Sequence, residues 1–219
     1  MRSSTTPPLT FAKGNDREKV FCVTTTARPW VDPEEPLPVR LMSTVWADRY
    51  AVHDALDALD AESDLGAWLV QNGLVEPAAP TTAQAESARH LRDALRALAA
   101  QATADARDRA VSPLDLSAAV GIVNDAIAAA PETERLRVVA TGLVRDVVEE
   151  AAPVTAALGR VARQGLALVT DDPTSLRACY APGCVLYFVK NHPRREWCSL
   201  TCGNRARAAR HYARRTARG

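Results

Sequence analysis

The sequence predicts a mainly α-helical fold with small β elements, an α+β class in which a helical N-terminal domain precedes a small cysteine-rich domain. Three observations predict this fold. Apolar residues recur at spacings of three and four along several segments, which is the period of an amphipathic helix. Runs of β-branched and aromatic residues are few and short. Four of the five cysteines fall between positions 179 and 202.

The composition is that of a globular chain. Its 219 residues are 47% apolar and 24% charged, which is enough for one medium domain and a small one. The longest stretch without a charged residue, 178–189, has 12 residues, whereas a membrane-spanning helix needs about 20. The N-terminus lacks the apolar run of a signal peptide. We therefore expect a cytoplasmic protein that does not contact the membrane.

The first 36 residues are rich in proline and predict an irregular segment, in which 20–26 could form a strand around a lone core cysteine, Cys22. The front domain is expected over 37–176. Its first element, 39–46, reads either as a strand or as the entry to a helix. Ser63 is a candidate N-cap for the next helix, and Gly73 is expected to end that helix. The apolar face of that helix would consist of Leu65, Trp68 and Leu69.

A long helix follows Pro80, and we expect the next helix to begin with Ser112 as cap and Pro113 in its first turn. The long helix has apolar positions at helical spacing, namely Ala88, Leu91, Leu95, Leu98 and Ala102. The apolar face expected for the helix after it consists of Leu116, Val120, Val123 and Ile127.

The segment 136–148 is β-branched and interrupted by Gly142, so it predicts a short hairpin, with a helix as the alternative. Pro153 then opens a further helix, which ends at Asp171. Its apolar positions are Leu158, Val161, Leu166 and Leu168.

Charge is distributed unevenly along the chain. The segment 177–219 contains ten Lys and Arg but one acid, Glu196, so it carries +9, while the remaining residues carry −8. Such a basic segment is drawn to polyanions, of which nucleic acid is the commonest in a cell. The alternative is a solvated arginine-rich helix that only keeps the protein soluble.

The clustered cysteines form two close pairs, Cys179-x4-Cys184 and Cys198-x3-Cys202, separated by 13 residues. This is the spacing of a four-thiolate zinc site, in which each pair supplies two ligands of a tetrahedron. Disulfides are disfavoured in the cytosol. We expect one structural Zn²⁺ with no open coordination position; the alternative is four ordinary buried cysteines.

The residues between and after the pairs predict a treble-clef-like finger over 177–219. A tight turn at 181–184 leads into a strand at 185–189, and a second short strand is expected at 194–197. A helix then runs from Cys198 to about Arg215. On that helix Arg207, Arg210, Arg214 and Arg218 share an arc of about 80°. Ala209 and Tyr212 lie on the other side, where they could pack on the hairpin.

At these residues the chain resembles the CGNR zinc finger, named for the tetrapeptide Cys202-Gly203-Asn204-Arg205. In that family an N-terminal domain called ABATE usually precedes the finger. The resemblance implies a bacterial, stress-induced transcription regulator whose finger binds DNA and whose front domain senses a small molecule or a partner. The candidate nucleic-acid-binding residues are Arg194, Arg195, Asn204, Arg205, Arg207, Arg210 and Arg214.

The resemblance of the front domain is strongest at 41–49, where family members often have Asn in place of Ser43. Polar side chains there and on the helix that follows Pro113 are the candidates for a ligand, although such side chains are more often caps, salt bridges or satisfied interior amides. They are Ser43, Asp48, Arg49 and Asn124.

We expect a zinc-finger DNA-binding transcription regulator that acts on duplex DNA. The alternative is a protein- or RNA-interaction module that presents the same arginine-rich helix. An enzyme is not expected, because the sequence has no nucleophile-elbow, phosphate-loop or zinc-protease motif. A single finger has a small footprint, so a homodimer joined through the front domain would add specificity.

Overall fold

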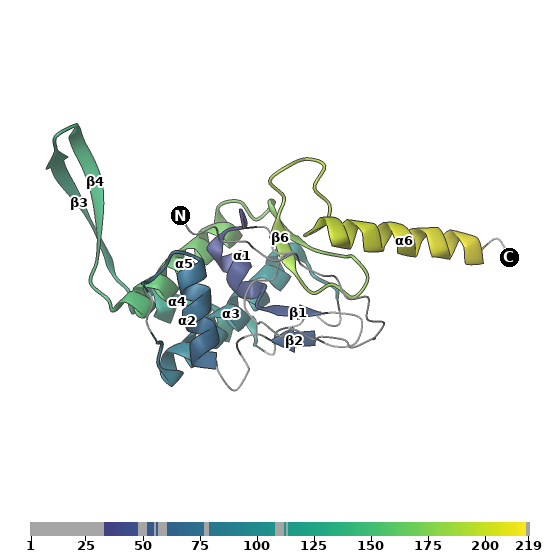
Figure 1. Ribbon diagram of the computed structural model, residues 1–219, viewed down its shortest axis with the longest axis horizontal. Helices are drawn as coiled ribbons and strands as arrows, with labels where there is room; N and C mark the ends of the chain where they lie inside the picture. The colour runs from purple at the N-terminus through teal and green to yellow at the C-terminus, as the bar shows by residue number, and fades with distance from the viewer. Residues whose placement is uncertain are drawn as a thin grey trace, which may run out of the picture.

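The computed structural model describes residues 33–47, 52–54, 56, 61–76, 79–107, 112 and 114–217. It shows a helical body, a hairpin projecting from one end and a long terminal helix projecting from the other (Figure 1). The helices are α1 Leu37–Met42, α2 Ala61–Gln71, α3 Thr82–Thr103, α4 Leu116–Ala128, α5 Pro153–Thr170 and α6 Leu200–Thr216. The strands form three antiparallel pairs, which are β1 Val45–Ala47 with β2 Val52–Asp54, β3 Glu132–Val139 with β4 Gly142–Glu149, and β5 Leu176–Ala178 with β6 Tyr187–Val189. The predicted α+β class is confirmed, while the strand expected at 20–26 and Cys22 lie outside the described residues.

None of the helices in the described part of the chain is long and apolar enough to cross a membrane.

Helix α3 lies at the centre of the body and packs on α1, α2, α4 and α5. It begins with a capping box, in which the Thr81 hydroxyl accepts from the Gln84 amide and the Gln84 side chain accepts from the Thr81 amide. Ala88, Leu91 and Leu95 are buried, as their spacing predicts, whereas Ala102 is exposed. The periodic face therefore covers most of the helix and ends before its last turn.

The beginning of the front domain combines both structures that the sequence left open at 39–46, since α1 ends at Met42 and β1 begins at Val45. The expected cap at Ser63 is wrong: α2 begins at Ala61, so Ser63 lies inside its first turn. Its end is as expected, because Gly73 adopts a φ of +64°, which stops the helix at little steric cost.

Helix α4 differs from its prediction in both its cap and its buried face. The cap is Asp115, whose carboxylate accepts from the Ala118 amide at 2.8 Å, and Ser112 lies before it. Pro113 lies outside the described residues. Leu116 and Val120 were expected in the core, but they are 45% and 44% exposed. The buried side chains are Ala119 and Val123, because α4 packs on α3 and α5 through a narrower stripe.

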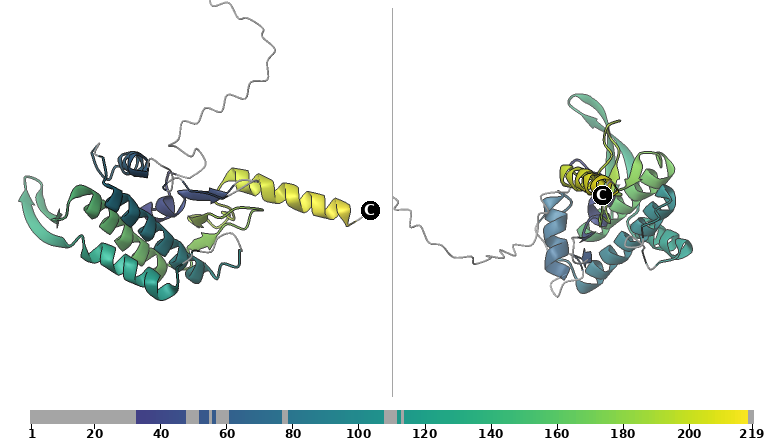
Figure 2. Two further views of the ribbon diagram at one scale, coloured as in Figure 1. Left: turned by 90° about the horizontal axis from the view of Figure 1, so that it is seen from below. Right: turned by 90° about the vertical axis from the view of Figure 1, so that its right-hand side faces the viewer.

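The segment after α4 is a β-hairpin, so the hairpin predicted at 136–148 is confirmed and the alternative of a helix is wrong. Val139 pairs with Gly142 across a two-residue turn, and Gly142 has a φ of +128°. The hairpin extends away from the helices (Figures 1 and 2). Ion pairs from its base to α5 join Glu149 to Arg160 and Glu132 to Arg163.

The finger is built on a different strand pair from the one expected. Strand β6 pairs with β5, which precedes the first cysteine, while 194–197 forms turns and no strand. Leu176, Ala178 and Tyr187 belong to the same hydrophobic core as the front helices. A second, smaller core surrounds the cysteines and includes Phe188. Finger and front domain therefore share packing at this strand pair.

Helix α6 leaves the finger after its first two turns and projects from the molecule (Figure 2). Its cap is Ser199, whose hydroxyl accepts from the Cys202 amide at 3.2 Å. Ala206 is buried, and every described residue beyond it is exposed. The expectation that Ala209 and Tyr212 pack on the hairpin is wrong, because the helix axis points away from the strands.

Candidate metal centre and basic helix

The four clustered cysteines meet at one point. Their sulfur atoms all lie within 4.8 Å of one another, and all four residues are buried. The Sγ–Sγ distance is 3.8 Å between Cys184 and Cys198 and 3.4 Å between Cys198 and Cys202. A tetrahedral Zn²⁺ with Zn–S bonds of about 2.3 Å requires sulfur atoms about 3.8 Å apart. The donor set thus fits one structural zinc ion.

Local backbone geometry positions each pair of ligands. Gly183 adopts a φ of +73° in a turn closed by a hydrogen bond from the Cys184 amide to the Ala181 carbonyl at 2.9 Å. The Leu186 amide then points at the Cys184 sulfur, 3.5 Å away. Cys198 directly precedes the cap of α6, and Cys202 lies in the first turn of that helix. One knuckle and one helix start therefore supply the tetrahedron.

The thiols perturb one another's pKa values, and a neighbouring arginine stabilises the thiolate form of Cys202. Hydrogen bonds from the Cys184 and Cys198 thiols lower the pKa of Cys179 to about 7. Hydrogen bonds from the other three thiols, and then from Arg205, hold the pKa of Cys202 far below its ordinary value. The Arg205 guanidinium donates to the Cys202 sulfur over 3.0 Å. Arg205 is thus a positioning residue for a zinc ligand.

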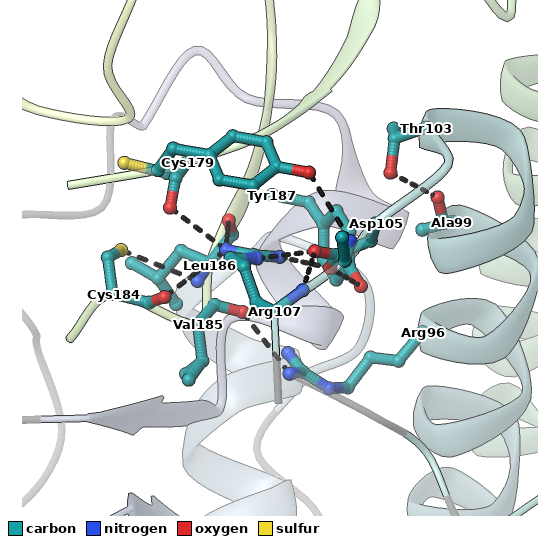
Figure 3. A network of polar contacts seen from close by, with 12 residues as sticks. Arg96, Ala99, Thr103, Asp105, Arg107, Cys179, Cys184, Val185, Leu186 and Tyr187 are labelled. Carbon is teal, nitrogen blue, oxygen red and sulfur yellow. Dashed lines mark hydrogen bonds and ion pairs between the residues drawn. The ribbon is translucent and has the colours of Figure 1, made fainter. Parts of the chain in front are cut away.

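A polar network joins the front domain to the zinc knuckle (Figure 3). The Nη1 atom of Arg107 donates to three carbonyl oxygens of the knuckle, at 3.0 Å to Cys179, 3.3 Å to Cys184 and 3.0 Å to Leu186. The other side of its guanidinium is held by Asp105, at 2.6 Å from Nη2 to Oδ2. The Arg107 guanidinium therefore bridges the end of α3 and the metal centre.

Tyr187 completes this network from β6. Its hydroxyl donates to Asp105 at 2.7 Å, and the Arg107 guanidinium lies 4.9 Å from its ring centre. Burial, together with the Asp105 carboxylate, raises the pKa of Tyr187 to about 12. Hydrogen bonds from Arg107 and Tyr187 keep the pKa of Asp105 below its usual range, although burial opposes them. The carboxylate is thus held charged between two donors.

Two further contacts fix the finger on the body. Arg96 of α3 is buried and donates to the Met42 carbonyl at 3.0 Å and the Val185 carbonyl at 3.2 Å, and burial lowers its pKa. Glu35 contacts the finger through both carboxylate oxygens. One accepts from Arg195 at 2.5 Å, and the other accepts from the Val189 amide at 3.0 Å.

The structure divides the candidate nucleic-acid-binding residues into two groups. Two are turned inward: Arg195 is held by Glu35 and lies 5.2 Å from the Phe188 ring centre, and Arg205 contacts a zinc ligand. The others are exposed, namely Arg194, Asn204, Arg207, Arg210 and Arg214. Within this group the Arg207 guanidinium donates to the Asn204 side chain at 2.6 Å. Arg218 lies outside the described residues.

The ligand candidates are not brought together. Ser43 is buried, and its hydroxyl donates to the Val39 carbonyl at 2.7 Å, so it has an internal acceptor. Asn124 is exposed on α4. Asp48 and Arg49 lie outside the described residues. A cavity of about 420 Å³ lies elsewhere, beside the end of α3 and the start of α4, and Asp105 and Arg107 are among the residues that line it.

Sequence reasoning missed the charged residues that join the two parts. Arg96 is at helical spacing from the buried Ala88 and Ala99, so its place on the apolar face of α3 was a usable signal. Glu35 lies just before α1 and Arg107 just after α3, where no periodic pattern marks a buried side chain. Their partners are mostly backbone carbonyls and amides, which a sequence does not distinguish.

Comparison with known families agrees with this division of the chain. Residues 35–172 match the ABATE family, described as "Putative stress-induced transcription regulator". Residues 175–215 match the family described as CGNR zinc finger. Among curated proteins, none matches the chain.

Proposed function

Because the chain belongs to the ABATE family and ends in a CGNR zinc finger, we propose that it is a DNA-binding transcription regulator that contacts duplex DNA through α6. The observation that carries the proposal is the exposure of Arg207, Arg210 and Arg214 along a helix that the metal centre holds clear of the body. No enzymatic step belongs to this role, and its place is the bacterial cytoplasm, where DNA is accessible.

The geometry of α6 suits a phosphate backbone or a major groove. At about 1.5 Å per residue, the three arginines extend over roughly 10 Å of helix. Beyond Ala206 every described position is exposed, so the helix can approach DNA without a clash from the front domain. Arg194 adds an exposed positive charge on the finger. Each phosphate neutralised releases counterions, which supplies affinity that depends on salt.

Effector sensing is the second part of the proposal. The cavity beside α3 and α4 is lined by Asp105 and Arg107, and the same Arg107 donates to the carbonyls of two zinc ligands. A small molecule that binds the Asp105–Arg107 pair would change the contacts of the knuckle from which the finger is built. This cavity is thus the place where ligand binding in the front domain can alter DNA affinity.

The test is a salt titration of duplex binding by the zinc-loaded full chain. With about six phosphates contacted, log affinity should fall with log salt at a slope of about −5. The triple variant R207Q/R210Q/R214Q should bind far more weakly and with a slope shallower by about 3. The matched control R135Q/R137Q/R145Q removes the same charge from the β3–β4 hairpin and should bind normally. Absence of duplex binding at low salt would overturn the proposal, and preferential binding of RNA or an acidic protein would replace it.

A further inference from the structure

A groove of about 640 Å³ lies where the last turn of α3 meets the finger. Ala102 and Thr103 of α3 form one part of its lining, and residues of β5, of β6 and of the segments next to these strands form the rest. The groove is separate from the cavity that Asp105 and Arg107 line, because the two have no lining residue in common. Its volume is in the range of pockets that hold a small organic molecule.

The strand register places two cations side by side in this groove. Both neighbours of Arg177 in β5 are buried, so Arg177 lies on the opposite face of the strand, where it is exposed. The register pairs Arg177 with Phe188, and the ladder continues to Lys190, whose amide donates to the Ser175 carbonyl at 2.8 Å. Lys190 is thus the diagonal neighbour of Arg177 on the same face. Diagonal neighbours are about 7–8 Å apart, so two long side chains can reach one anion between them.

The charges of the groove favour a ligand with a single negative charge. Its cations are Arg177, Lys190 and Arg195, but Arg195 already pairs with Glu35 at 2.5 Å. Neither Arg177 nor Lys190 forms an ion pair with a described residue, and the groove contains one acid, Glu196. Two cations against one carboxylate leave an excess of one positive charge. A monoanion matches this excess, whereas a polyanion such as a nucleic acid is repelled by Glu196.

The groove also offers an aromatic and apolar surface. Tyr180 lines it and is 54% exposed, and its hydroxyl accepts a hydrogen bond from the Ala106 amide at 3.4 Å. Ala102 and Pro173 line the groove as well, and both are exposed. A ligand that covers these side chains removes apolar area from water, which is favourable. An aromatic ring gains further from contact with the tyrosine ring.

We propose that this groove binds a small aromatic carboxylic acid. The carboxylate lies between Arg177 and Lys190, where charge-assisted hydrogen bonds hold it, and the ring lies against Tyr180. Such a ligand contacts α3 and the finger at the same time, so it stabilises the junction between them. Glu196 disfavours ligands with a second acidic group. The site is additional to the cavity beside α3 and α4, and it does not depend on DNA binding.

The first test titrates phenylacetate into the zinc-loaded full chain, without DNA, by isothermal titration calorimetry. We expect a dissociation constant of about 1 mM or lower, and much weaker binding of phenylacetamide, which is neutral, and of acetate, which has no ring. R177Q/K190Q should weaken phenylacetate binding about tenfold or more, because both charged donors are lost. Glu196→Gln should strengthen it several-fold, because it removes a like charge. The matched control R135Q/R137Q removes two positive charges from the β3–β4 hairpin and should bind phenylacetate as the natural sequence does.

The second test locates the ligand in the natural sequence, so it does not depend on a variant. In NMR spectra of the isotope-labelled chain, phenylacetate should shift the amide resonances of Thr103, Arg177 and Lys190. Shifts confined to Asp105 and Arg107 would place the ligand in the other cavity and overturn the proposal. Absence of phenylacetate binding, equal binding of phenylacetamide, tighter binding of inorganic phosphate, or full affinity in R177Q/K190Q would each overturn it as well. None of these results bears on duplex binding by α6, which the salt titration measures separately.

Discussion

Arg107 donates a hydrogen bond of 3.0 Å to the carbonyl oxygen of the zinc ligand Cys179, across the boundary between the helical body and the finger. The same guanidinium atom also reaches the carbonyls of Cys184 and Leu186. A carbonyl held in this way fixes the backbone on both sides of a metal-binding thiol. The geometry of the metal centre is thus set partly by a residue of the front domain, which outer-shell contacts of metal sites commonly do.

Replacing Arg107 by Met should destabilise the protein by about 3 kcal/mol or more, because three carbonyls lose a charged donor and Asp105 is left buried without its ion pair. Denaturant unfolding followed by circular dichroism measures the change. Arg210→Met is the matched control: this arginine is exposed, and the variant should stay within about 0.5 kcal/mol of the natural sequence. Equal unfolding midpoints for the two variants would refute the bridging role of Arg107.

The hydroxyl of Tyr187 should ionise at a higher pH than that of an ordinary tyrosine. Its pKa is raised to about 12 by burial and by the Asp105 carboxylate, so one of the four tyrosines should titrate about two pH units above the ordinary value. Because the folded-state pKa is raised, the stabilising effect is fully present below pH 10 and is lost as the pH rises through 12. Alkaline titration of tyrosinate absorbance measures this, and Tyr187→Phe should remove the late step. A late step that persists in the variant would assign it to another residue.

Zinc binding should require the four clustered cysteines and not the fifth. The natural sequence and Cys22→Ser should each hold one zinc per chain, whereas Cys184→Ser should lose it. Without the metal, α6 should lose helical content, because a 17-residue helix with few tertiary contacts is marginal in water. Metal analysis and far-ultraviolet circular dichroism measure both effects. One zinc per chain in Cys184→Ser would contradict the assignment.

Two helical glycines should respond to alanine with opposite signs. A Cβ at Gly159 would lie 2.4 Å from the Ala130 Cβ and 3.2 Å from the Ala126 carbonyl, so Gly159→Ala should destabilise by about 1–3 kcal/mol. A Cβ at Gly121 meets nothing within 4 Å, so Gly121→Ala should stabilise by up to about 1 kcal/mol through helix propensity. Thermal unfolding compares the two. A stabilising Gly159→Ala would mean that α5 and the end of α4 are less tightly packed than the structure shows.

Sequence patterns predicted the features of this protein that follow from regular residue spacing or from residue types with few structural roles. The face of α3 follows from the spacing of Ala88, Leu91 and Leu95, because a helix buries every third or fourth residue. The metal centre follows from the spacing of four cysteines, because few other arrangements use two such pairs. The hairpin at 136–148 follows from its β-branched residues and Gly142.

The remaining features depend on contacts between distant segments. Strand β6 was expected to pair with residues that follow it, yet its partner is Leu176–Ala178, because that segment continues the core of the front domain. Leu116 and Val120 read as core residues, but α4 buries the small Ala119 in their place, together with Val123, which the pattern did predict. Arg195 reads as a DNA contact by its charge, and only the position of Glu35 reveals its internal partner.

The packing of Leu176, Ala178 and Tyr187 against the front helices has a consequence for how this chain can be divided. The two family matches meet between residues 172 and 175, so a domain boundary for separate expression of the two regions would be placed there. A cut at that point would remove these three side chains from the larger core and expose apolar residues of the helical fragment to water. We therefore expect that neither region folds well in another protein unless the strand pair that completes the shared core is included with it.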